Sequence, residues 1–328
     1  MASNTPTLLV ENLQTYFYTK AGVAKAVDGV SFTVGKGEVM GLVGESGSGK
    51  SVTGFSIIGL VDPPGKVAGG RIVFDGDDIT HASEEHMRSL RGRRIAMIFQ
   101  DPMMTLNPVL RIDTQMIEAV QAHEKVDRQT AFERSRDALG QVGIPSPEER
   151  LKAYPHQFSG GMRQRVAIAI ALLHKPDLII ADEPTTALDV TIQGQILYEV
   201  QKLCRERGMS LIWITHDLAV VAGLADTISV MYAGRIVESG AIGEVIERPL
   251  HPYTNGLIGS VPSHNRRGQP LAQIPGMTPS LLNMPQGCSF HPRCPRADAA
   301  CLEMPAMTAP RRPGHCARCW HPHLEDAA

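Results

Sequence analysis

Residues 44–51 of this 328-residue chain read Gly-Glu-Ser-Gly-Ser-Gly-Lys-Ser, and this run constrains the fold more than any other. Its glycines let the backbone curl so that N–H groups face a chain of phosphates, and a following helix adds the positive end of its dipole. The preceding run, residues 38–43, is short and apolar, which is typical of a buried strand, and residues 51–60 are predicted to form a helix. A strand, a phosphate-binding loop and a helix in this order predict an α/β nucleotide-binding core.

Each residue of this loop is a candidate contact to the nucleotide. Lys50 is predicted to reach the β- and γ-phosphates of ATP, and the hydroxyl of Ser51 is predicted to hold Mg²⁺. The remaining candidates are Gly44, Glu45, Ser46, Gly47, Ser48 and Gly49. An aromatic side chain near the N-terminus is expected to stack on the base, and Tyr16, Phe17 and Tyr18 all compete for this role.

A second small-residue turn, Ser159-Gly160-Gly161, opens a helix that continues through the apolar run 166–173. A serine and two glycines at a helix N-terminus make another anion site. It lies more than a hundred residues from the phosphate loop. One subunit does not need two anion sites to bind its own nucleotide. In a dimer, however, the second site can cap the nucleotide that is bound to the partner subunit.

Three apolar strands are predicted to end in polar side chains suited to phosphate chemistry. Residues 177–183 end in Asp182, predicted to bind Mg²⁺, and in Glu183, predicted to be the general base that polarises the attacking water. Gln100 follows the predicted strand 95–99, and His216 follows the predicted strand 211–215.

The order and spacing of these motifs resemble those of ABC-type ATPases. The turn at Ser159 resembles their signature motif, usually Leu-Ser-Gly-Gly-Gln, with Phe158 and Met162 replacing the leucine and the glutamine. Residues 184–189 resemble the D-loop, which meets the partner subunit and ends here at Asp189.

The same resemblance implies roles for three further side chains. Gln100 resembles the Q-loop glutamine, a ligand of Mg²⁺ and a contact of the nucleotide. His216 resembles the switch histidine that contacts the γ-phosphate. Alignment with the family pattern favours Phe17 as the aromatic that stacks on adenine.

The rest of the chain supports an α/β fold of the ABC type. Predicted strands at 8–19, 26–34 and 70–75 suggest an antiparallel β subdomain beside a mixed, mostly parallel core sheet. A helical subdomain is expected at about 103–165. We therefore expect an ATPase domain at 1–247 and a loop-rich, cysteine-containing C-terminal extension at 248–328.

The composition excludes several classes of protein. No run of about eighteen apolar residues is present, so no membrane-spanning helix is expected, and the N-terminus lacks the pattern of a secretory signal. The formal net charge of −2 gives no reason to expect nucleic acid as a partner.

Five of the six cysteines lie in the last 41 residues. A loop-rich segment with few apolar residues needs a staple, and a cytosolic nucleotide-hydrolysing chain is not expected to use disulfides. Zinc and an iron–sulfur cluster both remain open. The run 287–298 resembles the C-terminal extension of ATPase subunits from dipeptide and oligopeptide ABC importers, as does His-Pro-Tyr-Thr at 251–254. That resemblance implies a [4Fe–4S] cluster on Cys288, Cys294, Cys301 and Cys319, with Cys316 as an extra.

The resemblance implies an ATP-hydrolysing subunit that powers import of peptides or similar small solutes. Its expected partners are a second related ATPase in a heterodimer, two transmembrane permease subunits and an extracytoplasmic solute-binding protein, and its expected location is peripheral, on the cytoplasmic face of the membrane. The alternative is a soluble ABC ATPase that acts on DNA or ribosomes. Because the predicted phosphate and Mg²⁺ ligands lie in the other domain, ATP hydrolysis is expected to survive largely when any of the four cysteines is replaced by serine.

Overall fold

The structure is a computed structural model that describes residues 5–185, 190–261 and 273–324. The described chain divides into two compact units. The first comprises the residues up to Val34, Val39–Thr80, and the chain from Trp213 onward. The second comprises Gly35–Glu38 and His81–Ile212.

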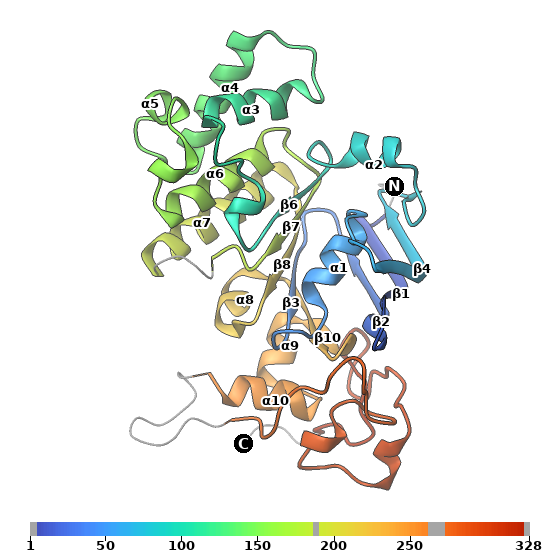
Figure 1. Cartoon of the computed structure of the whole chain (residues 1–328). Coiled ribbons are helices and arrows are strands. Elements are labelled where there is room, and N and C mark those ends of the chain that lie inside the picture. The colour runs from blue at the N-terminus through green and yellow to red at the C-terminus, as the bar shows by residue number, and fades with distance from the viewer. Residues whose placement is uncertain (1–4, 186–189, 262–272, 325–328) are drawn as a thin grey trace. The chain divides into compact units, whose positions relative to one another are not determined.

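An antiparallel sheet in the first unit has the strand order β2-β1-β4-β5. Figure 1 labels β1, β2 and β4 of this sheet. Its strands are β1 (Leu8–Thr19), β2 (Gly22–Val34), β4 (Gly65–Phe74) and β5 (Asp77–Asp78). Leu8 pairs with Val34 on one side and Phe74 on the other, and all three side chains are buried. These paired side chains form part of a buried face of the antiparallel sheet, which the sequence predicts as a subdomain.

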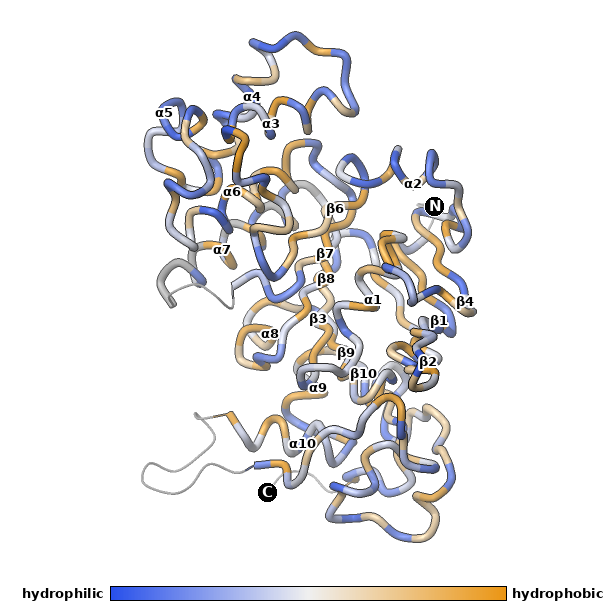
Figure 2. Tube along the Cα trace, in the orientation of Figure 1, coloured by the Kyte–Doolittle hydropathy of each residue, from blue (hydrophilic) through white to orange (hydrophobic). Residues whose placement is uncertain are grey.

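The same unit holds strands of the core sheet, in which β11, β10, β9 and β3 follow one another as neighbours. The strands β3 and β9 are parallel, whereas β10 is antiparallel to both β9 and β11. Their bounds are β3 (Val39–Val43), β9 (Thr227–Tyr232), β10 (Arg235–Ala241) and β11 (Cys316–Ala317). Every residue of β3 is buried, and hydrophobic residues predominate there (Figure 2).

Among the residues described, four α-helices belong to the first unit. They are α1 (Lys50–Ile57), α8 (Leu218–Leu224), α9 (Ile242–Glu247) and α10 (Pro252–Gly259). The helix α1 starts directly after the phosphate loop, as the sequence predicts. Strand β8 (Ser210–Thr215) is the segment in which the chain passes from the second unit to the first.

In the second unit, strands β6 (Ile95–Ile98) and β7 (Leu178–Asp182) pair in parallel. Its helices are α2 (Glu84–Leu90), α3 (Ile112–Gln121), α4 (Arg128–Gln141), α5 (Pro147–Leu151), α6 (Gly160–Leu172) and α7 (Val190–Arg207). Ile117 and Val120 of α3 pack on Ala131 of α4 in a buried cluster. None of the described helices is long and apolar enough to cross a bilayer.

The C-terminal tail is built from loops and two short 3₁₀ helices, at His291–Arg293 and Ala299–Leu302. The ring of Phe290 is 2% exposed, and its centroid lies 5.3 Å from that of Tyr232 and 5.4 Å from that of Tyr253. The tail is therefore anchored on β9 and α10 by an aromatic cluster, besides the two-residue pairing of β11 with β10. The mixed α/β fold and the loop-rich tail predicted from the sequence are confirmed.

Candidate functional site

The phosphate loop joins β3 to α1, and its glycines meet a backbone requirement. Gly47 and Gly49 have φ angles of +77° and +104°, which L side chains rarely adopt. A Cβ atom on Gly49 would lie 2.1 Å from the carbonyl oxygen of Ala26, so the neighbouring strand leaves no room for a side chain. The first turn of α1 carries no acidic residue, so the positive end of its dipole is not cancelled there.

Lys50 starts α1 and points back into the loop. Its ammonium donates to the carbonyl oxygens of Gly44 at 2.8 Å and Glu45 at 3.0 Å, and only 5% of the residue is exposed. The hydroxyl oxygen of Ser48 is buried with no hydrogen-bond partner among the described residues, and Ser51 is half-buried in the first turn. A buried ammonium, two hydroxyls and a curled backbone form a donor set that fits an anionic phosphate chain.

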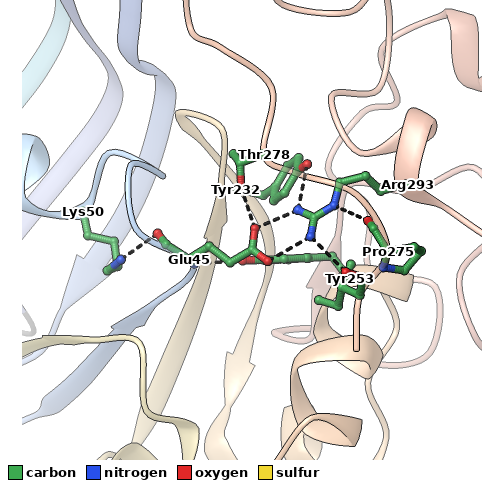
Figure 3. A network of polar contacts seen from close by, with 8 residues as sticks. Glu45, Lys50, Tyr232, Tyr253, Pro275, Thr278 and Arg293 are labelled. Carbon is green, nitrogen blue, oxygen red and sulfur yellow. Dashed lines mark hydrogen bonds and ion pairs between the residues drawn. The ribbon is translucent and has the colours of Figure 1, made fainter. Parts of the chain in front are cut away.

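Glu45 is held by residues that follow position 252 in the sequence (Figure 3). Its carboxylate accepts hydrogen bonds from Arg293 and Thr278, and its backbone N–H donates to the hydroxyl of Tyr253. Sequence reasoning missed Tyr253, Thr278 and Arg293 as neighbours of the loop. The only signal was that two of them lie in the His-Pro-Tyr-Thr and His-Pro-Arg-Cys runs that resemble the importer tail.

In the second unit, Asp182 ends β7 with 3% exposure and Glu183 follows it. Glu183 has a φ of +44°, a conformation that costs a non-glycine residue on the order of 1–3 kcal/mol and concentrates at functional sites. The side-chain amide of Gln100 donates to the carboxylate of Glu183 at 3.2 Å. The structure thus brings the predicted general base, Glu183, next to the predicted Mg²⁺ ligand Gln100.

Ser159 is the N-cap of α6, and its hydroxyl accepts the backbone N–H of Met162 at 3.3 Å. Ser159 and Gly160 are both exposed, and a Cβ on Gly160 would meet no atom within 4 Å. The signature turn therefore presents an accessible helix N-terminus within its own unit, as a surface that receives a partner's nucleotide requires.

The remaining nucleotide candidates are placed as follows. His216 is exposed and follows β8 in the first unit. Tyr16 donates its hydroxyl to Asp28 at 2.7 Å, whereas Phe17 packs its ring against Gly65. The assignment of Phe17 to the adenine stays a prediction. Asp189 lies outside the described residues.

Four tail cysteines line one cavity, namely Cys288, Cys294, Cys301 and Cys319. The pKa of Cys319 is raised to about 11, chiefly by burial and in smaller part by the charges of the other three thiols, so the four groups are close enough to interact. Burial also raises the pKa of Cys288 and of Cys294. Cys316 lies instead in β11, where it pairs with Ser239 of β10, and it is not among the described residues that line the cavity.

The spacing of these sulfurs bears on the kind of metal centre. Asp298, Cys301 and His321 are the only group of three potential metal ligands, among the residues described, whose donor atoms all lie within 4.8 Å of one another. No three of the four cysteine sulfurs, all of which the structure describes, are that close. Four thiolates on one Zn²⁺ would lie about 3.8 Å apart, because each Zn–S bond is about 2.3 Å long. The four thiols are therefore less tightly gathered in this structure than they would be around one Zn²⁺.

Comparison with known proteins decides the family. The ABC transporter family model matches residues 27–186, and that of the oligopeptide/dipeptide transporter C-terminal region matches residues 237–301. The chain is 49% identical over 314 residues to the dipeptide transport ATP-binding protein DppD of Bacillus subtilis, which covers 95% of this chain and 94% of that protein. The chain belongs to the ABC transporter family.

Other relatives agree with this assignment. The ABC chain is 47% identical over 315 residues to the oligopeptide transport ATP-binding protein OppD of Salmonella typhimurium, covering 96% of this chain and 93% of that one. A solved dimeric structure of the ATP-binding cassette MJ0796 bound to ADP and Pi superposes with a TM-score of 0.66 at 25% identity, covering 72% of this chain and 98% of that chain. This ABC protein is thus an ATP-hydrolysing subunit of a transporter.

Proposed function

We propose that this ABC ATPase powers the import of peptides or similar small solutes. The observation that carries the proposal is the combination, in one chain, of an ABC phosphate loop with a C-terminal region of the oligopeptide/dipeptide transporter type. Relatives that match along most of their length are named as ATP-binding proteins of dipeptide and oligopeptide transport. The alternative of an ATPase acting on DNA or ribosomes has no such support.

The proposed chemistry is hydrolysis of ATP by an activated water. The Lys50 ammonium would leave the loop carbonyls and bind the β- and γ-phosphates. Ser51, Asp182 and Gln100 would hold Mg²⁺, which neutralises charge on the phosphate oxygens when bound. The carboxylate of Glu183 would take a proton from the water as the water oxygen attacks the γ-phosphorus. The bond between that phosphorus and the oxygen it shares with the β-phosphate would break, and ADP would leave. His216 would contact the γ-phosphate.

We propose that each nucleotide is shared between two ATPase subunits. The N-cap hydroxyl of Ser159 and the turn Gly160-Gly161 would face the γ-phosphate bound to the partner. The exposure of this helix N-terminus supports the arrangement. The second subunit is proposed to be a related ATPase, and the pair would act on two permeases at the cytoplasmic face of the membrane, with an extracytoplasmic protein that supplies the solute.

Two substitutions test the proposed catalytic roles. Glu183→Gln keeps the shape of the side chain and removes its basicity, so ATP turnover should fall by roughly 10²-fold or more while ATP binding persists. Lys50→Ala should instead weaken binding itself. Turnover by phosphate release and affinity by titration calorimetry separate the two effects. Near-normal turnover of the Glu183→Gln variant in the assembled transporter would refute the assignment.

We propose that the four clustered thiols hold one [4Fe–4S] cluster. The grouping of Cys288, Cys294, Cys301 and Cys319 around one cavity supports this donor set. The four cysteines, bound to one cluster, would hold the tail together, because a segment with few apolar residues needs such a cross-link to be ordered.

Anaerobic purification tests the cluster directly. The protein should contain about four irons and four sulfides per chain, and Cys294→Ser should lose them, because its thiolate would ligate one iron. Cys316→Ser is the matched control and should keep the full content. Stoichiometric zinc without iron or sulfide would refute the cluster and would direct attention to the close group formed by Asp298, Cys301 and His321.

A further inference from the structure

Glu45, in the middle of the phosphate loop, forms an ion pair with a tail residue 248 positions away in the sequence. The guanidinium of Arg293 binds both carboxylate oxygens, with Nη1 2.7 Å from Oε2 and Nη2 3.1 Å from Oε1. The Arg293 side chain is 6% exposed and that of Glu45 is 28% exposed. The pair is bidentate and largely shielded from water, which is the geometry that gives an ion pair strength and direction.

The guanidinium is itself fixed from other sides (Figure 3). Its Nε donates to the carbonyl oxygen of Pro275 at 2.8 Å, and its Nη1 lies 3.3 Å from the hydroxyl of Tyr232. Thr278 donates to the same carboxylate at 2.6 Å. Burial by itself would raise the pKa of the Glu45 carboxyl, but the hydrogen bonds from Arg293 and Thr278 outweigh it, so the pKa lies below its ordinary value and the group stays ionised.

The backbone of Glu45 connects this network to the nucleotide ligands. Its N–H donates to the hydroxyl of Tyr253 at 2.9 Å, and its carbonyl oxygen accepts from the ammonium of Lys50 at 3.0 Å. A shift of Glu45 therefore changes both the curl of the loop and the position of the lysine. An ionised carboxylate on a loop that binds phosphates would also repel ATP unless a cation neutralises it.

We propose that Arg293 is a positioning residue for nucleotide binding. It neutralises Glu45 and pins the phosphate loop from the C-terminal extension. This inference rests on the proposed nucleotide site at residues 44–51. A change at Arg293, in the tail, is therefore expected to alter nucleotide binding, whereas the expectation that ATP hydrolysis largely survives concerns substitution of the four tail cysteines and stays a prediction.

The mechanism predicts a specific rescue. Arg293→Gln leaves an unpaired anion beside the phosphates and should raise the dissociation constant of MgADP on the order of 10-fold, the size of a typical coupling between sites. Adding Glu45→Gln removes that anion and should restore most of the affinity. If Arg293 acted only by holding the tail together, the second substitution would restore nothing.

The experiment is titration calorimetry of the full-length protein with MgADP, which binds without being hydrolysed. Arg312→Gln is the matched control, because Arg312 forms an exposed tail ion pair with Glu244 that does not touch the loop. Its affinity for MgADP should equal that of the wild type. Thermal melting and metal content should be measured for each variant, and both should stay near wild-type values if Arg293 acts through the loop.

The outcomes separate this inference from the proposed site. If Lys50→Ala binds MgADP as tightly as the wild type, the proposed nucleotide site is wrong. If binding depends on Lys50 but Arg293→Gln binds normally, or if Glu45→Gln does not rescue it, only the positioning role is refuted. If Arg293→Gln does not fold, Arg293→Lys replaces it in the test, because lysine keeps the positive charge and loses the bidentate hydrogen bonds. This variant should lose less affinity for MgADP than Arg293→Gln is expected to lose, and adding Glu45→Gln should again reduce the loss.

Discussion

His251, the N-cap of α10, is a buried histidine whose protonation should destabilise the protein in mild acid. The residue is 1% exposed, and its Nδ1 accepts the backbone N–H of Tyr253 at 3.0 Å. Protonation would remove that acceptor, because both nitrogens of an imidazolium are donors. Burial, helped by the charge of His323, lowers the pKa of His251 to about 3.

The sign of the effect follows from the two states. The folded pKa lies below the ordinary value of 6.5, so the unfolded chain binds a proton that the folded chain does not. This contribution to stability is present above pH 6.5 and is lost as the pH falls toward about 3. Between about pH 7.5 and 5.5 the folded ring stays neutral while the unfolded ring becomes about ten-elevenths protonated. The free energy of unfolding should then fall by about 1.4 kcal/mol.

Urea unfolding of the wild type and of His251→Asn at these two pH values measures the effect. The oxygen of asparagine can accept the same N–H and does not titrate, so the contributions of all other groups cancel in the comparison. The wild type should lose about 1.4 kcal/mol more than the variant between the two pH values. An equal loss in both proteins would show that His251 is not held neutral by its surroundings.

Three further experiments, two of which compare a pair of substitutions, test other parts of the structure. Ser159→Arg places bulk and charge at the exposed N-terminus of α6, so the variant should bind ATP but should not form the closed dimer, as measured by size-exclusion chromatography. If the monomeric variant lost its affinity for ATP, a site shared between subunits would be contradicted. Gly49→Ala should lower the free energy of unfolding more than Gly47→Ala does. Both place alanine at positive φ, but only at position 49 would the added Cβ lie 2.1 Å from a carbonyl oxygen, so equal urea midpoints would contradict this clash. Phe290→Ala should lower the free energy of unfolding by about 3–5 kcal/mol, because it leaves a cavity where a buried ring lay. Leu302 is 49% exposed, so Leu302→Ala should lower it little in the same urea assay, and similar losses would mean that Phe290 does not anchor the tail.

The elements around the nucleotide site could be predicted because their signals are local. Strand β3 is an unbroken apolar run, and the glycine-rich turn after it can only end in a helix that starts near Lys50. The same holds for β7, whose apolar run ends at Asp182. Each prediction needed only residues adjacent in the chain, and each is confirmed.

Predicting the contacts of these residues was harder. The bond between Gln100 and Glu183 joins the ends of β6 and β7, which are adjacent only because those strands pair in parallel. The left-handed conformation of Glu183 has no sequence signal, since glutamate rarely adopts it. Such features arise when the surrounding fold overrides the preference of the residue.

The sequence by itself determined the family and the use of ATP, because these follow from residue type and spacing. Only the tertiary structure decided that Arg293 neutralises Glu45 and that His251 is neutral. The physical reason is that the strength of a charge depends on its burial and on its partners. Both are set by residues far apart in the chain, and they exist only once the chain has folded.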